Sequence, residues 1–178
     1  HFISDHIIKV NGKQIEAKNI IIASGSRSKT PPFLKEEDIT KQKVGEQKIV
    51  TSTEILSINK IPRRLSIIGA GVIGMEFASA FSAFGSEVTV IEFMKECLPP
   101  IDSDIAKRLR KSLEKRGVTF YMQSAVKKIV SPSESEQTHT TVIFDKKGKE
   151  TSVETDLVLI ATGRQANIDN IGLESTGI

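Results

Sequence analysis

Three glycines stand at positions 69, 71 and 74, directly after an apolar stretch and directly before a helical pattern. This is the spacing G-x-G-x-x-G, in which each glycine has its own physical task. Gly69 permits a tight turn, Gly71 lets the backbone approach a phosphate without an intervening Cβ, and Gly74 allows close packing of helix on sheet. The N-terminus of the helix would then attract a pyrophosphate. Taken alone, the motif also fits an ordinary glycine-rich turn.

A carboxylate after the next apolar stretch supports a dinucleotide site. Glu92 follows Val88–Ile91 and comes 23 positions after Gly69 (92 − 69), close to the ~20 residues typical of a ribose-binding acid. Its carboxylate can accept hydrogen bonds from both hydroxyls of an adenine ribose but would repel a 2′-phosphate, which favours NAD over NADP. Lys95, three residues later, argues the other way. FAD carries the same adenosine half, so the motif does not by itself exclude a flavin.

Alternating strands and helices would position these groups. We expect buried strands at Leu65–Ile68 and Val88–Ile91 and a third strand at Val118–Met122, with helices at Gly71–Phe84 and from Asp102 through Lys115. Strands separated by helices imply a parallel sheet with right-handed crossovers. In the second helix, the residues expected to face the core are Ile105, Leu109 and Leu113.

The helical pattern stops after the third strand. Ala125–Val130, Thr140–Phe144 and Thr151–Glu154 have the pattern of strands joined by turns, and Leu157–Ile160 is again a buried strand. The predicted fold class is therefore α/β, a Rossmann-like dinucleotide-binding domain with a parallel sheet and an antiparallel three-stranded β-meander.

The first fifty residues follow a different pattern. Ile7–Val10 and Gln14–Ala17 flank Asn11-Gly12, which predicts a hairpin. Asn19–Ser26 is an apolar run that ends in small residues, so it predicts a strand buried on both faces. Residues 27–50 hold prolines and many charges, and we expect a linker or surface crossing there.

A short internal repeat connects the two ends of the chain. Gly12-Lys13, a strand and then Ile21–Ser26 match Gly148-Lys149, a strand and then Leu159–Arg164. The match suggests that one type of nucleotide-binding module occurs twice, the first time only as its last strands. Coincidence between two short apolar strands is the alternative.

The composition narrows the classes of function. The chain has 178 residues, of which 38% are hydrophobic and 26% charged, as in a globular protein. No apolar run approaches the ~20 residues of a membrane helix, and a net charge of +3 is too small to indicate nucleic acid. The single Cys97 excludes an intrachain redox dithiol pair, and the three histidines lack metal-ligand spacing. We therefore assign no metal site, no catalytic residue, and neither a membrane nor a nucleic acid as partner.

Four segments together resemble the flavin-dependent pyridine nucleotide–disulfide oxidoreductases, and within that family most closely the dihydrolipoamide dehydrogenases. These segments are IVTSTEIL at 49–56, GAGVIGME at 69–76, GSEVTVIEF at 85–93 and ATGRQAN at 161–167. In that family an FAD domain is interrupted by an NAD domain. The resemblance implies the end of an FAD-domain segment and a crossover linker at 1–49, the NAD-binding domain at 50–165, and the start of a return segment at 166–178.

The resemblance also implies roles for individual residues. Glu92 would hold the ribose of NAD, Val126 would lie against the adenine, and Gly163 would face the nicotinamide. The residues that would touch FAD are Ser24, Gly25 and Ser26. The residues that would cradle NAD are Gly69, Ala70, Gly71, Val72, Ile73, Gly74, Met75 and Glu76. Glu76 could provide a carboxylate at the nicotinamide end, although an acid early in a helix is also ordinary favourable placement.

For an intact dihydrolipoamide dehydrogenase, the resemblance implies that dihydrolipoamide reduces a disulfide, electrons pass to FAD, and FAD reduces NAD⁺. The resemblance implies a homodimer that serves the lipoyl groups of 2-oxo acid dehydrogenase complexes, in the cytoplasm or, in a eukaryote, the mitochondrial matrix. The family's redox cysteine pair and its catalytic His-Glu pair are not in these 178 residues. We therefore expect a domain fragment that is inactive by itself.

Two alternatives stay open. The same domain occurs in related flavoproteins such as mercuric reductases and soluble transhydrogenases, and the spacing of the cysteine pair in flanking sequence would separate these from a dihydrolipoamide dehydrogenase. A stand-alone NAD-binding module without catalysis is the alternative from another class.

Overall fold

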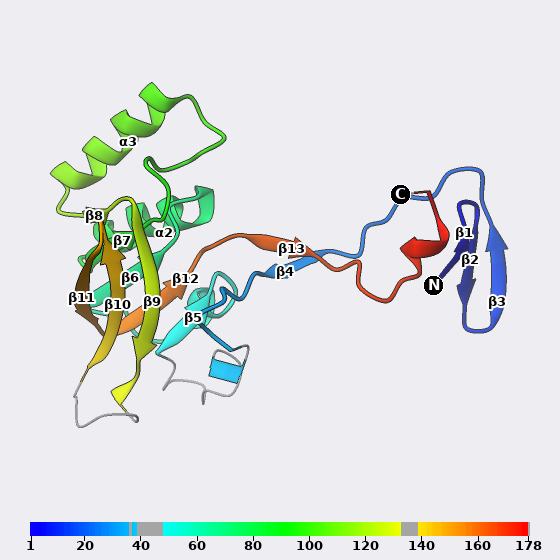
Figure 1. Cartoon of the computed structure of the whole chain (residues 1–178), viewed down its shortest axis with the longest axis horizontal. Coiled ribbons are helices and arrows are strands. Elements are labelled where there is room, and N and C mark those ends of the chain that lie inside the picture. The colour runs from blue at the N-terminus through cyan, green and yellow to red at the C-terminus, as the bar shows by residue number, and fades with distance from the viewer. Residues whose placement is uncertain (36, 39–47, 133–138, 178) are drawn as a thin grey trace. The chain divides into compact units, whose positions relative to one another are not determined.

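The computed structural model describes residues 1–35, 37–38, 48–132 and 139–177. By its internal contacts the chain divides into two compact units, one of Ser28–Gly163 and a smaller one of His1–Arg27 together with Arg164–Ile178. The larger unit contains the glycine motif and the strands and helices from β5 to β12 (Figure 1). The domain limits expected from the family resemblance, at 49/50 and 165/166, stay a prediction.

A five-stranded parallel sheet forms the centre of the larger unit, in the order β5-β12-β6-β7-β8. The strands are β5 (Ile49–Thr51), β6 (Arg64–Ile68), β7 (Glu87–Ile91), β8 (Thr119–Tyr121) and β12 (Leu157–Ile160). All four strands that the sequence predicted for this sheet are present, which confirms the α/β class.

β5 lies where the sequence predicted a linker. Ile49 and Val50 are buried, and Ile49 pairs with Val158 of β12. The prediction was wrong for these two residues. The prolines and charges earlier in the range are typical of a linker, and a three-residue edge strand is too short to change that overall pattern. Residues 36 and 39–47 of the same range lie outside the described residues.

The two faces of the sheet are covered by different layers (Figure 1). Helices α2 (Val72–Ala83) and α3 (Ser103–Lys115) belong to one core cluster, together with alternate strand residues such as Ile67 and Val90. An antiparallel meander covers the other face, in a second cluster with strand residues such as Ile68 and Ile91. Its strands are β9 (Ser124–Val130), β10 (Thr140–Lys146) and β11 (Lys149–Thr155). The predicted meander is confirmed, and Leu65–Ile68 of β6 and the whole of β12 are buried on both faces as their apolar runs predicted.

The ends of the two helices lie close to where the sequence placed them. The side chain of Asp102 accepts a hydrogen bond from the backbone N of Asp104, which is a normal N-cap. Gly85 and Gly117 follow the helices, each with a φ of +91°. After α2, Ser86 N also donates to Phe81 O at 3.0 Å, so the helix ends in a glycine-centred cap.

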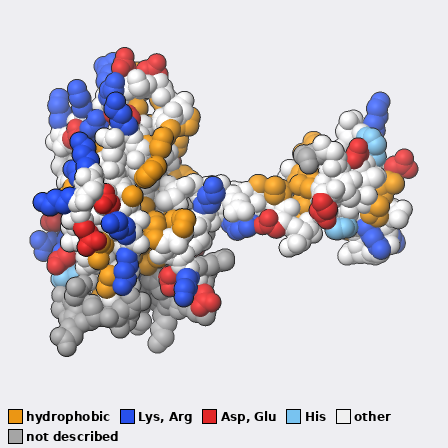
Figure 2. All heavy atoms as spheres, viewed as in Figure 1, with side chains coloured by type: hydrophobic (Ala, Val, Ile, Leu, Met, Phe, Trp, Pro, Cys, Tyr) orange, Lys and Arg blue, Asp and Glu red, His pale blue; other side chains and the backbone are white. Residues whose placement is uncertain are grey.

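The inward face of α3 differs from the prediction. Ile105 and Leu109 are exposed (54% and 37%), whereas Ala106 and Leu113 are buried. The helix contacts the core through a narrow seam in which small Ala106 lies 3.4 Å (O to Sγ) from buried Cys97. Helical spacing of apolar residues does not show which of two adjacent faces, that of Ala106 or that of Ile105 and Leu109, packs against the core. Lys and Arg side chains cover the outer side of α3 (Figure 2).

The smaller unit contains an antiparallel sheet of β1 (Phe2–Ser4), β2 (Ile7–Val10) and β3 (Lys13–Glu16). Asn11 and Gly12 form the turn between β2 and β3 with φ values of +48° and +81°, so the predicted hairpin is confirmed. The remaining elements outside the large sheet and its covering layers are β4 (Ser26–Ser28), which pairs with β13 (Arg164–Ala166), and the short helices η1 (Glu54–Ser57) and η3 (Leu173–Ser175).

The predicted buried strand at Asn19–Ser26 is not observed. Residues 20–25 have no strand assignment, and Ile21 is 91% exposed. A strand buried on both faces needs paired strands and covering layers, and within the described part of the chain no strand pairs with residues 20–25. The repeat is nevertheless visible in the backbone, because the matching glycines Gly25 and Gly163 have φ values of +77° and +121°. No helix in the described parts of the chain has the length and apolar character to cross a bilayer.

Candidate functional site

The carboxyl ends of three parallel strands meet at one edge of the sheet. Gly69, which follows β6, donates its N–H to Ile91 O of β7 at 2.9 Å, and Ala161 N after β12 donates to Ile68 O at 2.8 Å. A hollow of about 490 Å³ lies over this edge. Five of the residues predicted for the site line it, namely Gly69, Gly71, Glu92, Val126 and Gly163.

The three glycines of the motif differ in what surrounds them. A Cβ on Gly69, whose φ is +105°, would lie 2.5 Å from Ala161 O, and a Cβ on Gly74 would overlap the carbonyl oxygen of Gly69. A Cβ on Gly71 would meet no atom of the protein within 4 Å. The packing of the chain therefore requires Gly69 and Gly74, whereas Gly71 keeps its surface open toward the hollow that it lines.

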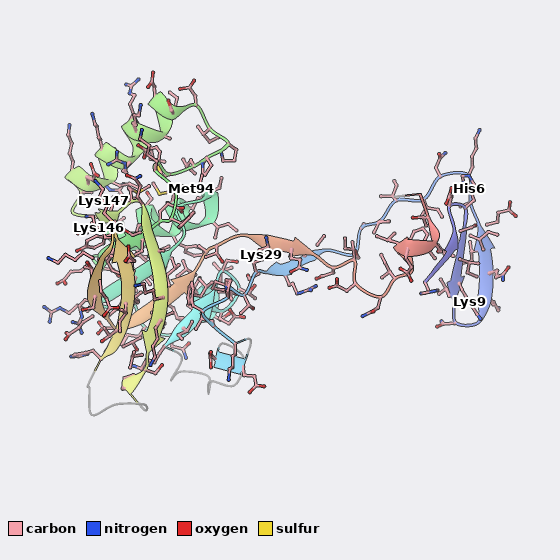
Figure 3. The ribbon with its side chains drawn as sticks, in the orientation of Figure 1. His6, Lys9, Lys29, Met94, Lys146 and Lys147 are labelled. Atoms are coloured by element: carbon pink, nitrogen blue, oxygen red, sulfur yellow. The ribbon has the colours of Figure 1, made fainter. Side chains whose placement is uncertain are left out.

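Glu92 connects the end of β7 to the glycine turn. Its side chain is buried, its Oε2 accepts a hydrogen bond from Ala70 N at 2.6 Å, and its Oε1 accepts one from Met94 N at 2.7 Å. Met94 lies at the end of the larger unit that carries α3 (Figure 3). Each carboxylate oxygen can accept a second hydrogen bond, so Glu92 can hold the turn and still bind hydroxyl groups in the hollow.

The other predicted residues do not line this hollow. Ala70, Gly74 and Met75 are buried, Ile73 is half-buried, and Val72 and Glu76 are exposed on α2. Ser24, Gly25 and Ser26 are exposed in the smaller unit, where Gly25 O accepts a hydrogen bond from Asn167 N at 3.0 Å. Their roles in nucleotide binding stay predictions.

Some residues that line the hollow were not predicted from the sequence. Pro32 and Phe33 line it from the segment that reads as a linker, and Phe93 and Pro99 line it from the loop after Glu92. The sequence signal for Pro32 and Phe33 is that both are apolar within a charged stretch. Phe93 stands directly beside the predicted ribose acid, and this adjacency was the signal for the other pair.

An ion pair fixes this loop to α3. Arg110 donates from Nε to Glu96 Oε1 at 2.8 Å, from Nη2 to Glu96 Oε2 at 3.0 Å, and from Nη1 to Glu114 Oε1 at 2.6 Å. The Arg110 guanidinium lowers the pKa of Glu96 to about 2. Burial raises the pKa of the neighbouring Cys97 thiol to about 11, which makes this cysteine unreactive at neutral pH.

We expect this ion pair to contribute to stability at neutral pH and to lose its effect in acid. Folding lowers the pKa of Glu96 from 4.5 to about 2, so the pair stabilises the fold fully above about pH 4.5 and its contribution disappears as the pH falls toward 2. Urea unfolding should show Glu96→Gln to be less stable than the unsubstituted chain at about pH 7, with the difference shrinking at about pH 3. An equal difference at both pH values would contradict the assignment.

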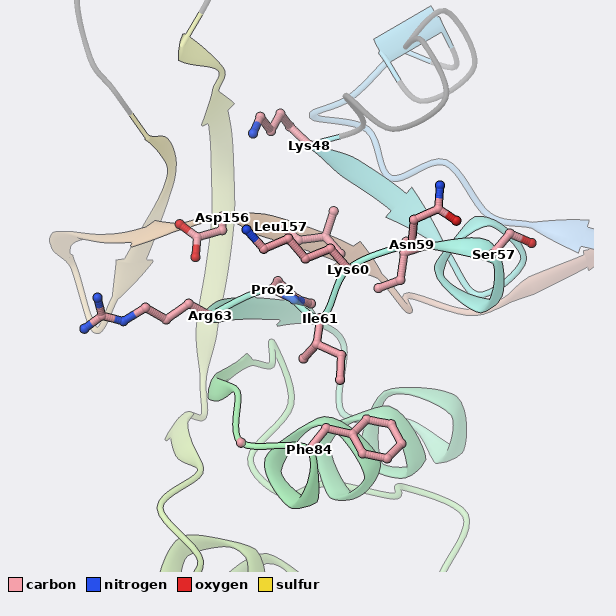
Figure 4. Close-up of a pocket in the computed structure, with 12 residues that line it drawn as sticks. Lys48, Ser57, Asn59, Lys60, Ile61, Pro62, Arg63, Phe84, Asp156 and Leu157 are labelled. Carbon is pink, nitrogen blue, oxygen red and sulfur yellow. The ribbon is translucent and has the colours of Figure 1, made fainter.

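A larger hollow, of about 620 Å³, lies at the opposite edge of the sheet. It is lined by Lys60, Arg63 and Leu157 near the amino ends of the strands, and Figure 4 shows Ile61 facing Phe84 across it. Ligands of open α/β sheets bind outside the carboxyl ends of the strands, and this hollow has no glycine turn. We therefore take the smaller hollow as the functional site.

No group of three or more His, Cys, Asp or Glu side chains within residues 1–35, 37–38, 48–132 and 139–177 is placed to hold a metal ion. The groups that line the hollow are instead Gly71, which is the N-cap of α2, and one buried carboxylate, that of Glu92. This set suits an anionic nucleotide with a free ribose.

The model of the family described as pyridine nucleotide-disulphide oxidoreductase matches residues 2–178. The chain belongs to this family. Among curated relatives of the family, the chain is 37% identical over 170 residues to a dihydrolipoyl dehydrogenase of Acholeplasma laidlawii. It is also 37% identical over 166 residues to a mitochondrial dihydrolipoyl dehydrogenase of Dictyostelium discoideum. These alignments cover 94% and 93% of this chain but 47% and 32% of the relatives, so the chain spans less than half of their length.

Solved structures of the family have the same fold. The HOCl-induced flavoprotein disulfide reductase RclA of Escherichia coli matches with a TM-score of 0.73 at 31% identity, over 99% of this chain and 38% of that one. LpdA of Mycobacterium tuberculosis matches with a TM-score of 0.72 at 25% identity, over 96% of this chain and 34% of that one. The resemblance drawn from the four sequence segments is thereby confirmed.

Proposed function

We propose that the larger unit binds NAD(H) in the hollow at the carboxyl ends of β6, β7 and β12. The observation that carries this proposal is the pair of Gly71 and Glu92, which line one hollow with an open backbone on one side and a buried carboxylate on the other. A pyrophosphate binds close to an open backbone, and an unphosphorylated ribose binds to a carboxylate.

The start of α2 supplies the donors for the pyrophosphate. The first intrahelical hydrogen bond runs from Met75 N to Gly71 O at 3.0 Å, so the N–H groups of Val72, Ile73 and Gly74 are not used by the helix. Together with the positive end of the helix dipole they favour an anion. The N–H of Ala70 is bound to Glu92 and is not one of these donors.

The nicotinamide would lie toward Gly163, and the adenine toward Val126, at two other parts of the lining. When bound, the nicotinamide ring of NAD⁺ accepts a hydride. The chain's own contribution is to bind and orient the dinucleotide, and the hydride donor in our proposal is an FAD held by the intact protein.

For the intact protein we propose an FAD-dependent dihydrolipoyl dehydrogenase, because relatives with that name match over nearly the whole chain. It would be a homodimer, act on the lipoyl groups of 2-oxo acid dehydrogenase complexes, and work in the cytoplasm or the mitochondrial matrix. A second candidate is another flavoprotein disulfide reductase, which the likeness to RclA favours. Oxidation of dihydrolipoamide by the intact protein would separate the two.

The proposed cofactor preference has a direct test. Titration of the 178-residue chain with NADH and NADPH, followed by calorimetry, should show tighter binding of NADH by about tenfold, because Glu92 repels a 2′-phosphate. The flavin is not needed for this measurement. Equal affinities, or a preference for NADPH, would contradict the role of Glu92.

A further inference from the structure

We propose that Glu96 and Arg110 are positioning residues for the dinucleotide site, because they hold the loop Phe93–Ile101 against the hollow and thereby set the affinity for the adenosine half of the ligand. The inference rests on the proposed function and extends it to two residues outside the hollow. Neither side chain lines the hollow, and no sequence motif points to either.

The loop has a direct contact with the glycine turn. Leu98 donates its N–H to Ala70 O at 2.8 Å, and the Ala70 N–H is the group bound by Glu92. The loop also places Phe93 and Pro99 in the lining of the hollow. A displacement of the loop would therefore disturb the position of Glu92, through Ala70, together with the wall of the site that Phe93 and Pro99 form.

The backbone of this loop needs an external restraint. Leu98 has a φ of +51°, a left-handed conformation that a leucine rarely adopts and that persists only when the surrounding structure holds it. Its side chain is buried, which provides part of that restraint. Phe93, in contrast, is 73% exposed and contributes little.

The other restraint comes from α3. The Arg110 guanidinium forms two parallel hydrogen bonds to the Glu96 carboxylate, a charge-assisted geometry that is both strong and directional. Both side chains are only about a fifth exposed (22% and 20%), so solvent weakens the pair little. Glu114 binds Arg110 from the next turn of the helix and fixes its orientation. The loop is thus held between α3 and the glycine turn.

The size of the effect follows from the population of the restrained loop. If removal of the ion pair leaves the loop in its binding position for about one fifth of the time, the apparent dissociation constant rises about 5-fold. The rise should affect ligands that contain adenosine and spare those that do not. A loss of stability alone would not discriminate between ligands in this way.

The test compares Arg110→Met in the 178-residue chain with the unsubstituted chain. Calorimetric titration should show NADH and ADP-ribose each bound about 5-fold more weakly, with nicotinamide mononucleotide unchanged. Hydrogen exchange should become faster in the loop Phe93–Ile101. Arg110→Lys keeps the charge but not the two parallel bonds, and should recover part of the affinity.

Arg64→Met is the matched control. Arg64 is 25% exposed and binds two carboxylates, Glu154 and Asp156, at the opposite edge of the sheet. The Arg64→Met variant should lose about as much stability as Arg110→Met does, but it should bind NADH as tightly as the unsubstituted chain. Equal weakening in both variants, or unchanged ADP-ribose binding by Arg110→Met, would overturn the inference alone. Absence of any NADH binding by the unsubstituted chain would overturn the proposed function, and the inference with it.

Discussion

Replacing Gly74 by alanine should destabilise the larger unit by about 3 kcal/mol, a typical cost of forcing an atom into a packed core. A Cβ at this position would overlap the carbonyl oxygen of Gly69 and lie 3.4 Å from the Ala161 side chain. Neither a backbone carbonyl in a tight turn nor a residue bound to β6 can move aside easily. Urea unfolding followed by circular dichroism measures the loss.

Gly71→Ala is the matched control for this prediction. Gly71 has a φ of −72°, which alanine adopts freely, and no protein atom lies within 4 Å of its Cβ position. The variant should keep its stability to within about 0.5 kcal/mol and lose NADH affinity by at least about tenfold, because the methyl group enters the place of the pyrophosphate. If Gly71→Ala bound NADH normally, the dinucleotide would not approach this turn as proposed.

Glu92→Gln should weaken NADH binding by about 30-fold. An amide has one acceptor oxygen, so its NH₂ group would face the N–H of either Ala70 or Met94 and leave a buried donor without a partner. That loss lowers the stability of the folded chain. The affinity falls because the ribose hydroxyls then meet a neutral amide in place of a carboxylate, and a lost hydrogen bond to a charged group costs about 2 kcal/mol, or about 30-fold in affinity. The negative charge is lost as well, so the preference for NADH over NADPH should largely disappear.

Glu87→Gln provides the control, because Glu87 begins the same strand, β7, at the other edge of the sheet. Its side chain is 66% exposed and its ion pair with Arg63 is long, 3.6 Å from Nε to Oε1. The substitution should change neither stability nor binding measurably. Calorimetric titration of Glu92→Gln and of Glu87→Gln with NADH and with NADPH measures both effects. A Glu92→Gln chain that kept its NADH affinity would show that this carboxylate does not bind the ribose.

The sequence predicted the larger unit well because local and long-range signals agree there. Apolar runs that end at Gly69 and Glu92 are buried on both faces, and Asp102 and Gly117 bound α3 at both ends. Such patterns can be recognised in the sequence because helix caps and left-handed glycines involve only a few neighbouring residues. The order of the strands, with β12 between β5 and β6, had no such local signal.

The wrong predictions share a different cause. The run Asn19–Ser26 has the composition of a buried strand, but burial depends on neighbours that the run itself does not contain. Ile105 and Leu109 lie on a plausible helical stripe, yet the contact with Cys97 is made by Ala106. Apolar residues report the tendency to be buried and not the partner that buries them.

The site was predicted in part. The spacing of Gly69, Gly71 and Gly74 and the distance to Glu92 follow from backbone geometry, and the structure places all but Gly74 on one hollow. The second task of Glu92, which binds the N–H of Ala70, was not foreseen because a hydrogen bond across 22 residues has no sequence signature. The ion pair of Glu96 and Arg110 was missed for the same reason.

The place of β12 in the sheet has a consequence for how the larger unit folds. β12 is the last of its five parallel strands along the chain, yet it pairs with both β5 and β6, more than 85 residues earlier. During synthesis, β6 must therefore wait with one edge unpaired until Leu157–Ile160 has emerged. Pairings of such long sequence separation form slowly, and an exposed strand edge is where partly folded chains associate. The strand that completes the proposed nucleotide site is thus also the one that covers the exposed edge of β6 during folding.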